Sequence, residues 1–457
     1  MDYESFIQDK ESYTVGQGFA PVFESPAAFD FQRSLIEFAV RQGRAAIFAD
    51  CGLGKTLVEL VWAENIRQAT GRQVLILAPL AVSVQHVREA EKFGVELEAS
   101  RDGQHTCPLA VTNYERLHFF DASRYAGIVC DESSILKNCQ GHRRREITRF
   151  MKHIPYRLLC TATAAPNDYH ELGTSSEALS VLGYLDMLDR FFKKEEKHTL
   201  RRFRGGDRFE SGWRFKGHAE IPFWRWVASW ARSARSPADL GFDDSSFTLP
   251  PLHEHLHAVE TLKPRPGMLL DIPASGLAEQ RAERRHSIRE RCEKVAALAG
   301  ECDSAIIWCH MNDEANLVEN LIGADAVQVA GSDSIEAKEE RLLGFADGKI
   351  RYLVTKPRIA GFGLNLQRHA NVILFPSHSY EQYYQAIRRC WRFGQTRPVN
   401  VHIVHTPGET KVMASLRRKK AQAEKMFESI VQEMSRAMSV TPRSRNGARP
   451  EMPPWIR

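Results

Sequence analysis

Short apolar runs alternate with longer amphipathic stretches along the first part of the chain. Each run has the length of a buried strand, and the stretches between the runs carry the spacing of helices. Strands that alternate with helices of about 10–15 residues predict a parallel sheet with right-handed crossovers. In such a sheet, polar chemistry collects just past the strand ends. The expected strands cover residues 45–48, 74–77, 110–111, 128–130 and 158–160.

A second series of the same kind begins after Pro250 and Pro251, which mark a boundary between two structured regions. Its expected strands cover residues 305–308, 326–330, 352–354, 372–375 and 399–404, with helices at 314–321 and 336–345. We therefore predict an α/β protein with two tandem parallel-sheet domains. We expect a leader (1–28), a first lobe (29–189), a helical basic and aromatic insert with a linker (190–258), a second lobe (259–409), and a basic C-terminal helix with a disordered tail (410–457).

The insert mixes basic with aromatic residues, and four of the eight tryptophans fall between residues 213 and 230. This mixture is typical of surfaces that follow a nucleic-acid backbone and stack on bases. However, four positions have the i, i+3, i+4, i+7 spacing of a helix face that packs into a core. We favour the core for these four and keep the surrounding basic residues as phosphate contacts. The four are Phe223, Trp226, Val227 and Trp230, and the basic residues are Arg201, Arg202, Arg204, Arg214, Lys216 and Arg225.

Three histidines, His253, His255 and His257, alternate along an apparent strand after the insert. Histidines can hold a metal ion, but no cysteine or acidic partner stands at ligand spacing here. We favour a solvated strand face over a metal site.

The composition sets the class of protein. The chain has 457 residues, 43% hydrophobic and 26% charged, which suits a globular protein of two or three domains. No apolar run approaches the roughly 20 residues that span a bilayer, so we expect no membrane partner. Nine cysteines without a Cys-x-x-Cys pair indicate reduced thiols and a cytoplasmic location. The net charge of +5 permits a nucleic-acid partner without demanding one.

The segment 48–60 has the order strand, glycine turn, helix, which is typical of a phosphate site. Gly52 and Gly54 let backbone N–H groups converge on an anion, and the following helix adds the positive end of its dipole. Lys55 would reach the β- and γ-phosphates of ATP, and the Thr56 hydroxyl would hold Mg²⁺. Ala49 stands where the usual pattern has its first glycine. The alternative is a strand-to-helix turn with an incidental lysine.

Polar residues also follow two later strands. Asp131 and Glu132 come directly after the fourth expected strand. The first carboxylate can hold Mg²⁺ and the second can orient or deprotonate an attacking water. Two acidic loop residues are the alternative, which the preceding apolar strand disfavours. Thr161 and Thr163 follow the fifth strand and could link the ATP site to another surface. Gln32 carries a donor and an acceptor that suit the edge of adenine, although taken alone it is better explained as a solvated helix residue.

A helix over residues 380–392 is the candidate source of positive charge in the second lobe, which has no P-loop. Gln385, Arg389 and Arg392 fall at i, i+4 and i+7 and form one polar stripe. Two arginines on one face match the forked geometry that phosphoryl transfer recruits as arginine fingers. Arg388 is rotated by about 100° from Arg389 around the helix axis, so it lies off this stripe. We predict that ATP lies between the lobes; a solvated charged face is the alternative.

In this order, the segments resemble the motifs of the superfamily 2 helicases. Among these, they are most similar to SWI/SNF-type, DEAD/DEAH-box-like ATPases in a compact phage- or prophage-like form. The resemblance covers about residues 29–180 and 249–432. It rests on Gln32, Asp50-Cys-Gly-Leu-Gly-Lys-Thr56, Ala78-Pro79-Leu80, Thr112-Asn-Tyr-Glu115, Asp131-Glu-Ser-Ser-Ile-Leu-Lys-Asn138, Cys160-Thr-Ala-Thr-Ala-Ala-Pro-Asn167, Gly361-Phe-Gly-Leu-Asn-Leu366 and Gln385-Ala-Ile-Arg-Arg-Cys-Trp-Arg-Phe-Gly-Gln395.

The resemblance implies two RecA-like lobes that use ATP and Mg²⁺ to move on nucleic acid. It implies that Pro79 and Tyr114 of the first lobe, and Arg358 and Asn365 of the second, face the nucleic acid. It also adds Gly363 to the ATP site, beside Gln385.

One departure from the family concerns coupling. Where the DEAH-like motif has an imidazole that relays between the ATP site and the threonine motif, this chain has Ser134. The resemblance therefore leaves Ser134, Thr161 and Thr163 as the coupling residues, with a hydroxyl in the place of the imidazole.

Three functions fit these observations. The first is a monomeric, DNA-dependent ATPase that acts as a translocase or helicase in a bacterial or phage-infected cell. The second is the same kind of ATPase, acting on RNA instead of DNA. The third is an ATP-gated module that clamps DNA and recruits replication or recombination proteins.

Overall fold

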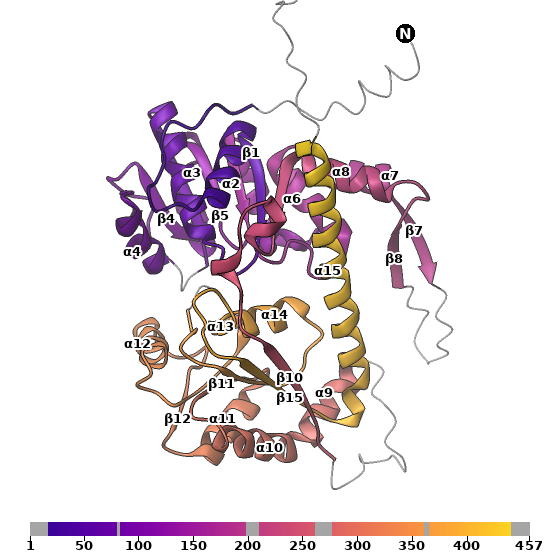
Figure 1. The fold of residues 1–457 in the computed structure, drawn as a ribbon. Helices are drawn as coiled ribbons and strands as arrows, with labels where there is room; N and C mark the ends of the chain where they lie inside the picture. Colours follow the sequence, from indigo (N-terminus) through magenta and orange to yellow (C-terminus); the bar gives the residue numbers. More distant parts are fainter. Residues whose placement is uncertain (1–16, 80–82, 198–209, 261–276, 361–364, 440–457) are drawn as a thin grey trace, which may run out of the picture.

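The structure is a computed structural model, and it describes residues 17–79, 83–197, 210–260, 277–360 and 365–439. Within these residues two parallel sheets form two lobes, one above the other in Figure 1. The start of the predicted leader, the predicted disordered tail from residue 440 and the basic residues Arg201, Arg202 and Arg204 lie outside the described residues.

The first lobe contains a parallel sheet in the order β3-β4-β2-β5-β6-β1-β9. Its strands are β1 (Arg44–Ala49), β2 (Gln73–Ala78), β3 (Glu98–Ala99), β4 (Leu109–Asn113), β5 (Tyr125–Cys130), β6 (Tyr156–Cys160) and β9 (Ala231–Ala234). Its helices are α2 (Asp30–Gln42), α3 (Lys55–Thr70), α4 (Ser83–Phe93), α5 (His142–Met151), α6 (Leu172–Leu179), α7 (Tyr184–Phe191) and α8 (Glu220–Trp230). An antiparallel hairpin, β7 (Phe192–Lys197) with β8 (Glu210–Phe215), extends from this lobe (Figure 1).

The second lobe repeats the plan with a sheet in the order β10-β15-β14-β11-β13-β12, in which every pair is parallel. Its strands are β10 (Leu252–Ala258), β11 (Ala305–Trp308), β12 (Ala326–Gln328), β13 (Tyr352–Thr355), β14 (Asn371–Leu374) and β15 (Val399–His405). Its helices are α9 (Leu277–His286), α10 (Ile288–Gly300), α11 (Asn312–Ile322), α12 (Ile335–Ala346), α13 (Pro357–Ala360) and α14 (Tyr380–Arg388). Thus the predicted α/β class with two tandem parallel sheets is confirmed.

The C-terminal part of the predicted insert (190–258) belongs to the two lobes instead. Strand β9 pairs with β1, so this part of the supposed insert is an edge strand of the first sheet. Helix α8 packs on the same lobe, and its predicted core positions Phe223, Trp226, Val227 and Trp230 are at most 1% exposed. Strand β10 pairs with β15, so the second lobe begins at Leu252 and not at residue 259. Within the described residues, only the β7–β8 hairpin projects as an insert.

The C-terminal helix α15 (Thr410–Ser439) joins the two lobes, as Figure 1 shows by its course along both. Near its start, Met413 and Leu416 belong to the core of the second lobe. Further along, the helix presents a second apolar group to the core of the first lobe. This group is Met426, Phe427, Ile430 and Met434. The helix predicted to be a basic tail is therefore an amphipathic strut that is part of both cores.

Two expectations about chemistry can be compared with the fold. None of the nine cysteines, all of which lie in the described residues, forms a disulfide. Among the described helices, none combines the length and the apolar composition required to cross a membrane.

The histidines of β10 lie next to β15, where they form a stacked group. His255 stacks on His402 with ring centroids 4.9 Å apart, and His257 Nε2 lies 3.1 Å from His402 Nδ1. Burial, followed by the charges of His255 and His257, lowers the pKa of His402 to about 4. Its ordinary value is about 6.5.

We expect this group to make the fold less stable in mild acid. Between about pH 6.5 and pH 4, His402 is protonated in the unfolded chain but mostly neutral in the folded chain. The free energy of unfolding should therefore fall as the pH drops through this range, and His402→Gln should make that fall smaller. Urea titrations at several pH values measure it, with the exposed His118→Gln as control. An unchanged pH dependence in His402→Gln would contradict the assignment.

Candidate active site

The P-loop is built as the sequence predicts, between the end of β1 and the start of α3. Gly52 and Gly54 have φ angles of 94° and 72°, in the left-handed region that side chains rarely adopt. Space is also short, because a Cβ on Gly54 would lie 2.3 Å from Gln32 Nε2. A Cβ on Gly52 would lie 2.7 Å from the backbone nitrogen of Phe393, which belongs to the second lobe. Both glycines are therefore required by the local structure.

Gln32 supports this loop from α2. Its Nε2 donates a hydrogen bond to the Leu53 carbonyl at 3.0 Å, and its Oε1 accepts one from the Phe29 N–H at 3.0 Å. One donor hydrogen and one lone pair of the amide are still available for a ligand. The predicted contact with adenine stays a prediction.

Lys55 is the first residue of α3, and its ammonium group lies over the P-loop. Its Nζ donates to the carbonyls of Ala49 at 3.0 Å and Asp50 at 3.4 Å. Thr56 is half-buried in the first helical turn. A phosphate at the helix N-terminus would meet both side chains. The residues present thus fit the β- and γ-phosphates and the Mg²⁺ of a nucleotide.

The acid pair follows β5 and is almost completely buried. Asp131 and Glu132 are each 8% exposed, and Glu132 has a left-handed φ of 51°. A non-glycine residue in this region is strained, and such strain is common at functional sites. Burial, followed by the Glu59 carboxylate, raises the pKa of Asp131 to about 7, whereas His86 and Lys55 lower it. A divalent cation beside Asp131 would offset this cost of burial.

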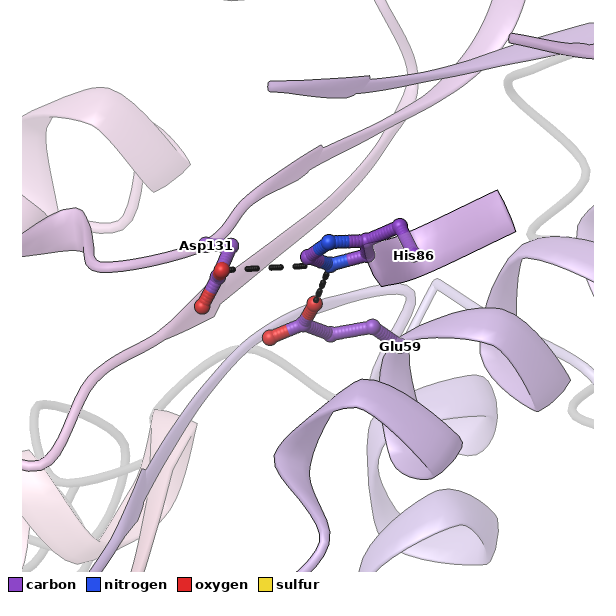
Figure 2. A group of neighbouring side chains, drawn as sticks. All are labelled: Glu59, His86 and Asp131. Atoms are coloured by element: carbon purple, nitrogen blue, oxygen red, sulfur yellow. Dashed lines mark hydrogen bonds and ion pairs between the residues drawn. The ribbon is translucent and has the colours of Figure 1, made fainter. Parts of the chain in front are cut away.

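Two further buried side chains, His86 and Glu59, lie near the carboxylate of Asp131 (Figure 2). His86 of α4 places Nε2 3.2 Å from Glu59 Oε2 of α3 and 3.8 Å from Asp131 Oδ2. Both His86 and Glu59 are fully buried. The three residues form the one group of potential metal ligands found among the described residues.

The threonine motif contacts the acid pair. Thr161 Oγ1 donates to Glu132 Oε2 at 3.4 Å, and the Thr163 N–H donates to Thr161 Oγ1 at 3.0 Å. Ser134 is buried in the short helix η3 (Ser133–Lys137) that follows the acid pair. Its coupling role stays a prediction.

The second lobe inserts Arg388 into the P-loop. The Arg388 guanidinium forms a forked ion pair with both carboxylate oxygens of Asp50, which also accepts a hydrogen bond from the Tyr384 hydroxyl. Arg388 is 3% exposed, and burial, followed by Arg392 and Arg389, lowers its pKa to about 9. The positive charge that the second lobe brings to the P-loop therefore includes Arg388, which was not part of the predicted polar stripe.

Arg389 and Arg392 also lie at the interface between the lobes. Arg389 Nη2 is 3.9 Å from Glu132 Oε1. Burial, followed by the Asp131 carboxylate, raises the pKa of Glu132, whereas Lys55 and Arg389 lower it. Burial and then Arg389 lower the pKa of Arg392, and Cys51 of the P-loop raises it. The predicted helix over 380–392 ends at Arg388, so Arg392 follows the helix and its place on a helical stripe is wrong.

Gln385 lies on α14 beside these arginines. It is 1% exposed, and neither atom of its amide has a hydrogen-bond partner among the described residues. Unsatisfied buried amides are costly, so a polar ligand at this position would be stabilising. This orphaned amide supports the predicted place of Gln385 in the ATP site.

The predicted nucleic-acid contacts are only partly exposed. Pro79 is half-buried after β2, and Arg358 and Asn365 of the second lobe are exposed. Tyr114 differs from the expectation, because its ring is 3% exposed and its hydroxyl donates to the Asp131 carbonyl at 2.5 Å. Its side chain therefore positions the acid pair and offers no surface to nucleic acid. Gly363 lies outside the described residues.

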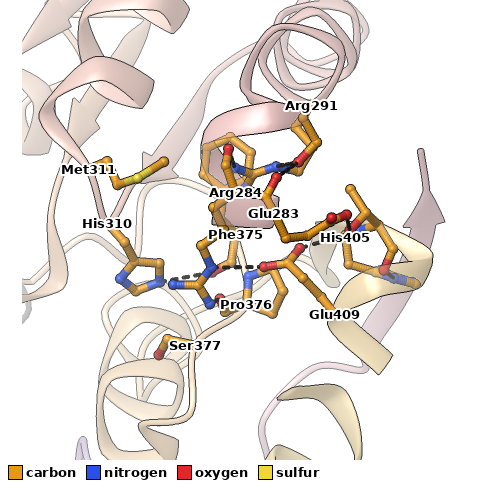
Figure 3. A network of polar contacts seen from close by, with 12 residues as sticks. Glu283, Arg284, Arg291, His310, Met311, Phe375, Pro376, Ser377, His405 and Glu409 are labelled. Atoms are coloured by element: carbon orange, nitrogen blue, oxygen red, sulfur yellow. Dashed lines mark hydrogen bonds and ion pairs between the residues drawn. The ribbon is translucent and has the colours of Figure 1, made fainter. Parts of the chain in front are cut away.

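A separate buried network in the second lobe holds the start of α15 (Figure 3). Arg284 pairs with Glu409 at 2.9 Å and donates to the Pro376 carbonyl, while Glu283 accepts from the Thr406 hydroxyl at 2.7 Å. It contains none of the predicted site residues, and its contacts fix the strut to the second lobe.

Comparisons with known proteins bear on the fold and on the second lobe. Residues 289–394 match the helicase conserved C-terminal domain. The Mycobacterium smegmatis helicase Lhr, solved bound to ssDNA and AMP-PNP, matches 88% of this chain with a TM-score of 0.52 and 14% identity. The chain therefore shares the fold of this helicase. The match covers 48% of the Lhr chain, so the protein spans about half the length of that helicase.

A phage protein is also similar to this helicase-fold chain. The putative protein p41 of Acyrthosiphon pisum secondary endosymbiont phage 1 is 23% identical over 446 residues, covering 81% of this chain and 91% of that protein. The prediction of a helicase is thus confirmed for the fold and for the C-terminal domain over residues 289–394. The SWI/SNF-type subgroup and the phage-like form stay predictions.

Several site residues were missed by the sequence analysis. Asp50 had a signal, because it directly follows a strand. Glu59 interrupts a helix whose buried positions are otherwise mostly apolar, which also marks it. His86 and Tyr384 had no distinguishing signal, since a lone histidine or tyrosine on an amphipathic helix is common.

We expect the Asp50–Arg388 pair to hold the lobes together. In Arg388→Gln the Asp50 carboxylate loses its buried partner, which destabilises the closed arrangement by about 3–5 kcal/mol. The lobes should separate, and small-angle X-ray scattering should record a larger radius of gyration. Arg289→Gln is the matched control, because it removes an exposed ion pair of the same lobe. Equal radii for the two variants would refute the role of the pair.

Proposed function

We propose that this protein is an ATP-dependent DNA translocase or helicase, in which ATP hydrolysis drives the two lobes along DNA. The observation that carries the proposal is the pair of cations from different lobes at one carboxylate. Lys55 of the first lobe and Arg389 of the second both act on Glu132. A nucleotide that binds there would be held by both lobes, so that its hydrolysis changes the contact between them.

Each residue then has a role in phosphoryl transfer to water. Lys55 binds the β- and γ-phosphates, and Thr56 with Asp131 holds Mg²⁺. Glu132 orients the attacking water and accepts its proton, which its raised pKa favours. Arg389 and Arg392 stabilise the charge on the transferred group. Gln32 and Gln385, together with Gly363, complete the nucleotide site.

DNA is the proposed track and RNA the alternative. Support for DNA comes from the family resemblance and from the Lhr neighbour, which was solved with ssDNA. Arg358 and Asn365 are exposed on the second lobe, where they can contact a phosphate backbone. We place the protein in the cytoplasm as a monomer.

A second candidate is an ATP-gated clamp that recruits replication or recombination proteins. One observation favours it: Arg388 and Tyr384 of the second lobe bond directly to Asp50 of the first lobe. A clamp held closed by such contacts would have little motor output.

Removing the P-loop amine should abolish catalysis. Lys55→Ala loses the cation that contacts the transferred phosphate, and we expect ATP turnover to fall by at least about 100-fold. Glu132→Gln should reduce turnover to a similar extent while nucleotide binding persists. Phosphate release and binding of a fluorescent ATP analogue measure the two effects. Lys152→Ala, at an exposed lysine of the same lobe, is the control and should match wild type.

The nucleic acid on which the protein acts can be identified from the stimulation of ATP turnover. We expect duplex DNA to raise ATP turnover more than single strands or RNA do, and ATP to drive displacement of the third strand of a DNA triplex. Turnover that no polynucleotide changes would rule out the motor. Stimulation by DNA without strand displacement would favour the clamp.

A further inference from the structure

Ser134 stands where the family has its relay histidine, but an imidazole from a different helix lies beside Asp131. His86 of α4 lies between Glu59 of α3 and the side chain of Asp131, as Figure 2 shows. These residues come from the P-loop helix, the helix after Pro79 and the end of β5. The imidazole thus joins the segment that holds the phosphates to the residue that would hold Mg²⁺.

One proton lies between His86 Nε2 and Glu59 Oε2, because two groups 3.2 Å apart that both only accept would repel each other. The distance from the same nitrogen to Asp131 Oδ2 is 3.8 Å, too long for a hydrogen bond. A displacement of α4 by less than about 1 Å would bring Asp131 within bonding distance. The imidazole can therefore change its carboxylate partner through a small movement of one helix.

Tyr114 provides a second connection to the same residue. Its hydroxyl donates to the backbone carbonyl of Asp131, and it begins the short helix η1 (Tyr114–Phe119), in which Phe119 is 53% exposed. Helix α4 begins four positions after Pro79. Both segments were predicted to face the nucleic acid, and both end in a buried contact with Asp131.

We propose that His86 and Tyr114 are positioning residues that couple nucleic-acid binding to Asp131. They take over the role of the family's relay histidine, at whose position this chain has Ser134. The proposal rests on the proposed function and adds a route through the first lobe. Nucleic acid that moves the start of α4 or of η1 would shift the Asp131 side chain or its backbone. Since Asp131 holds Mg²⁺, such a shift alters turnover.

The test compares coupling in variants of these two residues. His86→Leu removes the ring nitrogens, His86→Gln restores a donor at a similar distance, and Tyr114→Phe removes only the hydroxyl. The first readout is the ratio of DNA-stimulated to unstimulated ATP turnover. The second is the change in Kd for labelled DNA when a non-hydrolysable ATP analogue is added, which linkage ties to the same coupling.

We expect His86→Leu to lower the stimulation ratio about 10-fold and Tyr114→Phe about 5-fold, with partial rescue in His86→Gln. The nucleotide-dependent change in Kd should shrink in parallel. His105→Gln and Tyr125→Phe are matched controls, because that histidine and tyrosine bond to each other at 2.9 Å in the same lobe and do not touch Asp131. They should keep the wild-type ratio.

The outcomes separate this proposal from the proposed function. If no polynucleotide stimulates the wild type, the motor fails and this proposal fails with it. If the wild type is stimulated and all three variants keep its ratio and its shift in Kd, only this proposal is overturned. If His86→Leu does not fold, His86→Gln and Tyr114→Phe decide the question. A second Mn²⁺ ion bound by wild type and lost in His86→Gln would overturn it in favour of a metal site.

Discussion

Burial of opposite charges where the two lobes meet is the constraint on which this structure depends. Asp50 and Glu132 of the first lobe face Arg388 and Arg389 of the second, and Lys137 of the first faces Glu381. A buried charge is costly unless a partner compensates it. The two lobes can therefore approach closely in only a few arrangements. One of these brings the P-loop against α14.

The chain maintains this arrangement with a strut that runs along both lobes. Helix α15 is part of both cores, and Lys419 Nζ bonds to Asn167 of the first lobe and to the His378 carbonyl of the second. Beside α14, however, a cavity of about 570 Å³ separates the lobes, lined by Tyr384, Thr163 and Phe427 among others. A ligand in this cavity would contact both lobes at once.

The pattern of apolar and polar residues predicted most of the fold, because most strands are buried and appear in the sequence as short apolar runs. The exceptions lie at sheet edges. Strand β9 has the sequence Ala-Arg-Ser-Ala, without an apolar run, and pairs only with β1. Strand β10 alternates as a strand should, but its pairing with β15 involves residues about 150 positions away. Edge strands need less apolar sequence, so hydrophobicity marks them weakly and says nothing about their neighbour.

The sequence by itself determined which residues stand at strand ends, and thereby the cradle of Gly52, Gly54 and Lys55 and the acid pair that faces it. It could do so because strand and helix periods fix the face on which a side chain lies. Only the tertiary structure decided what lies opposite each face. It selected Arg388 as the partner of Asp50, and it brought His86 to Asp131 from a helix 45 positions earlier. Such meetings depend on how helices and lobes pack, and no local period encodes that.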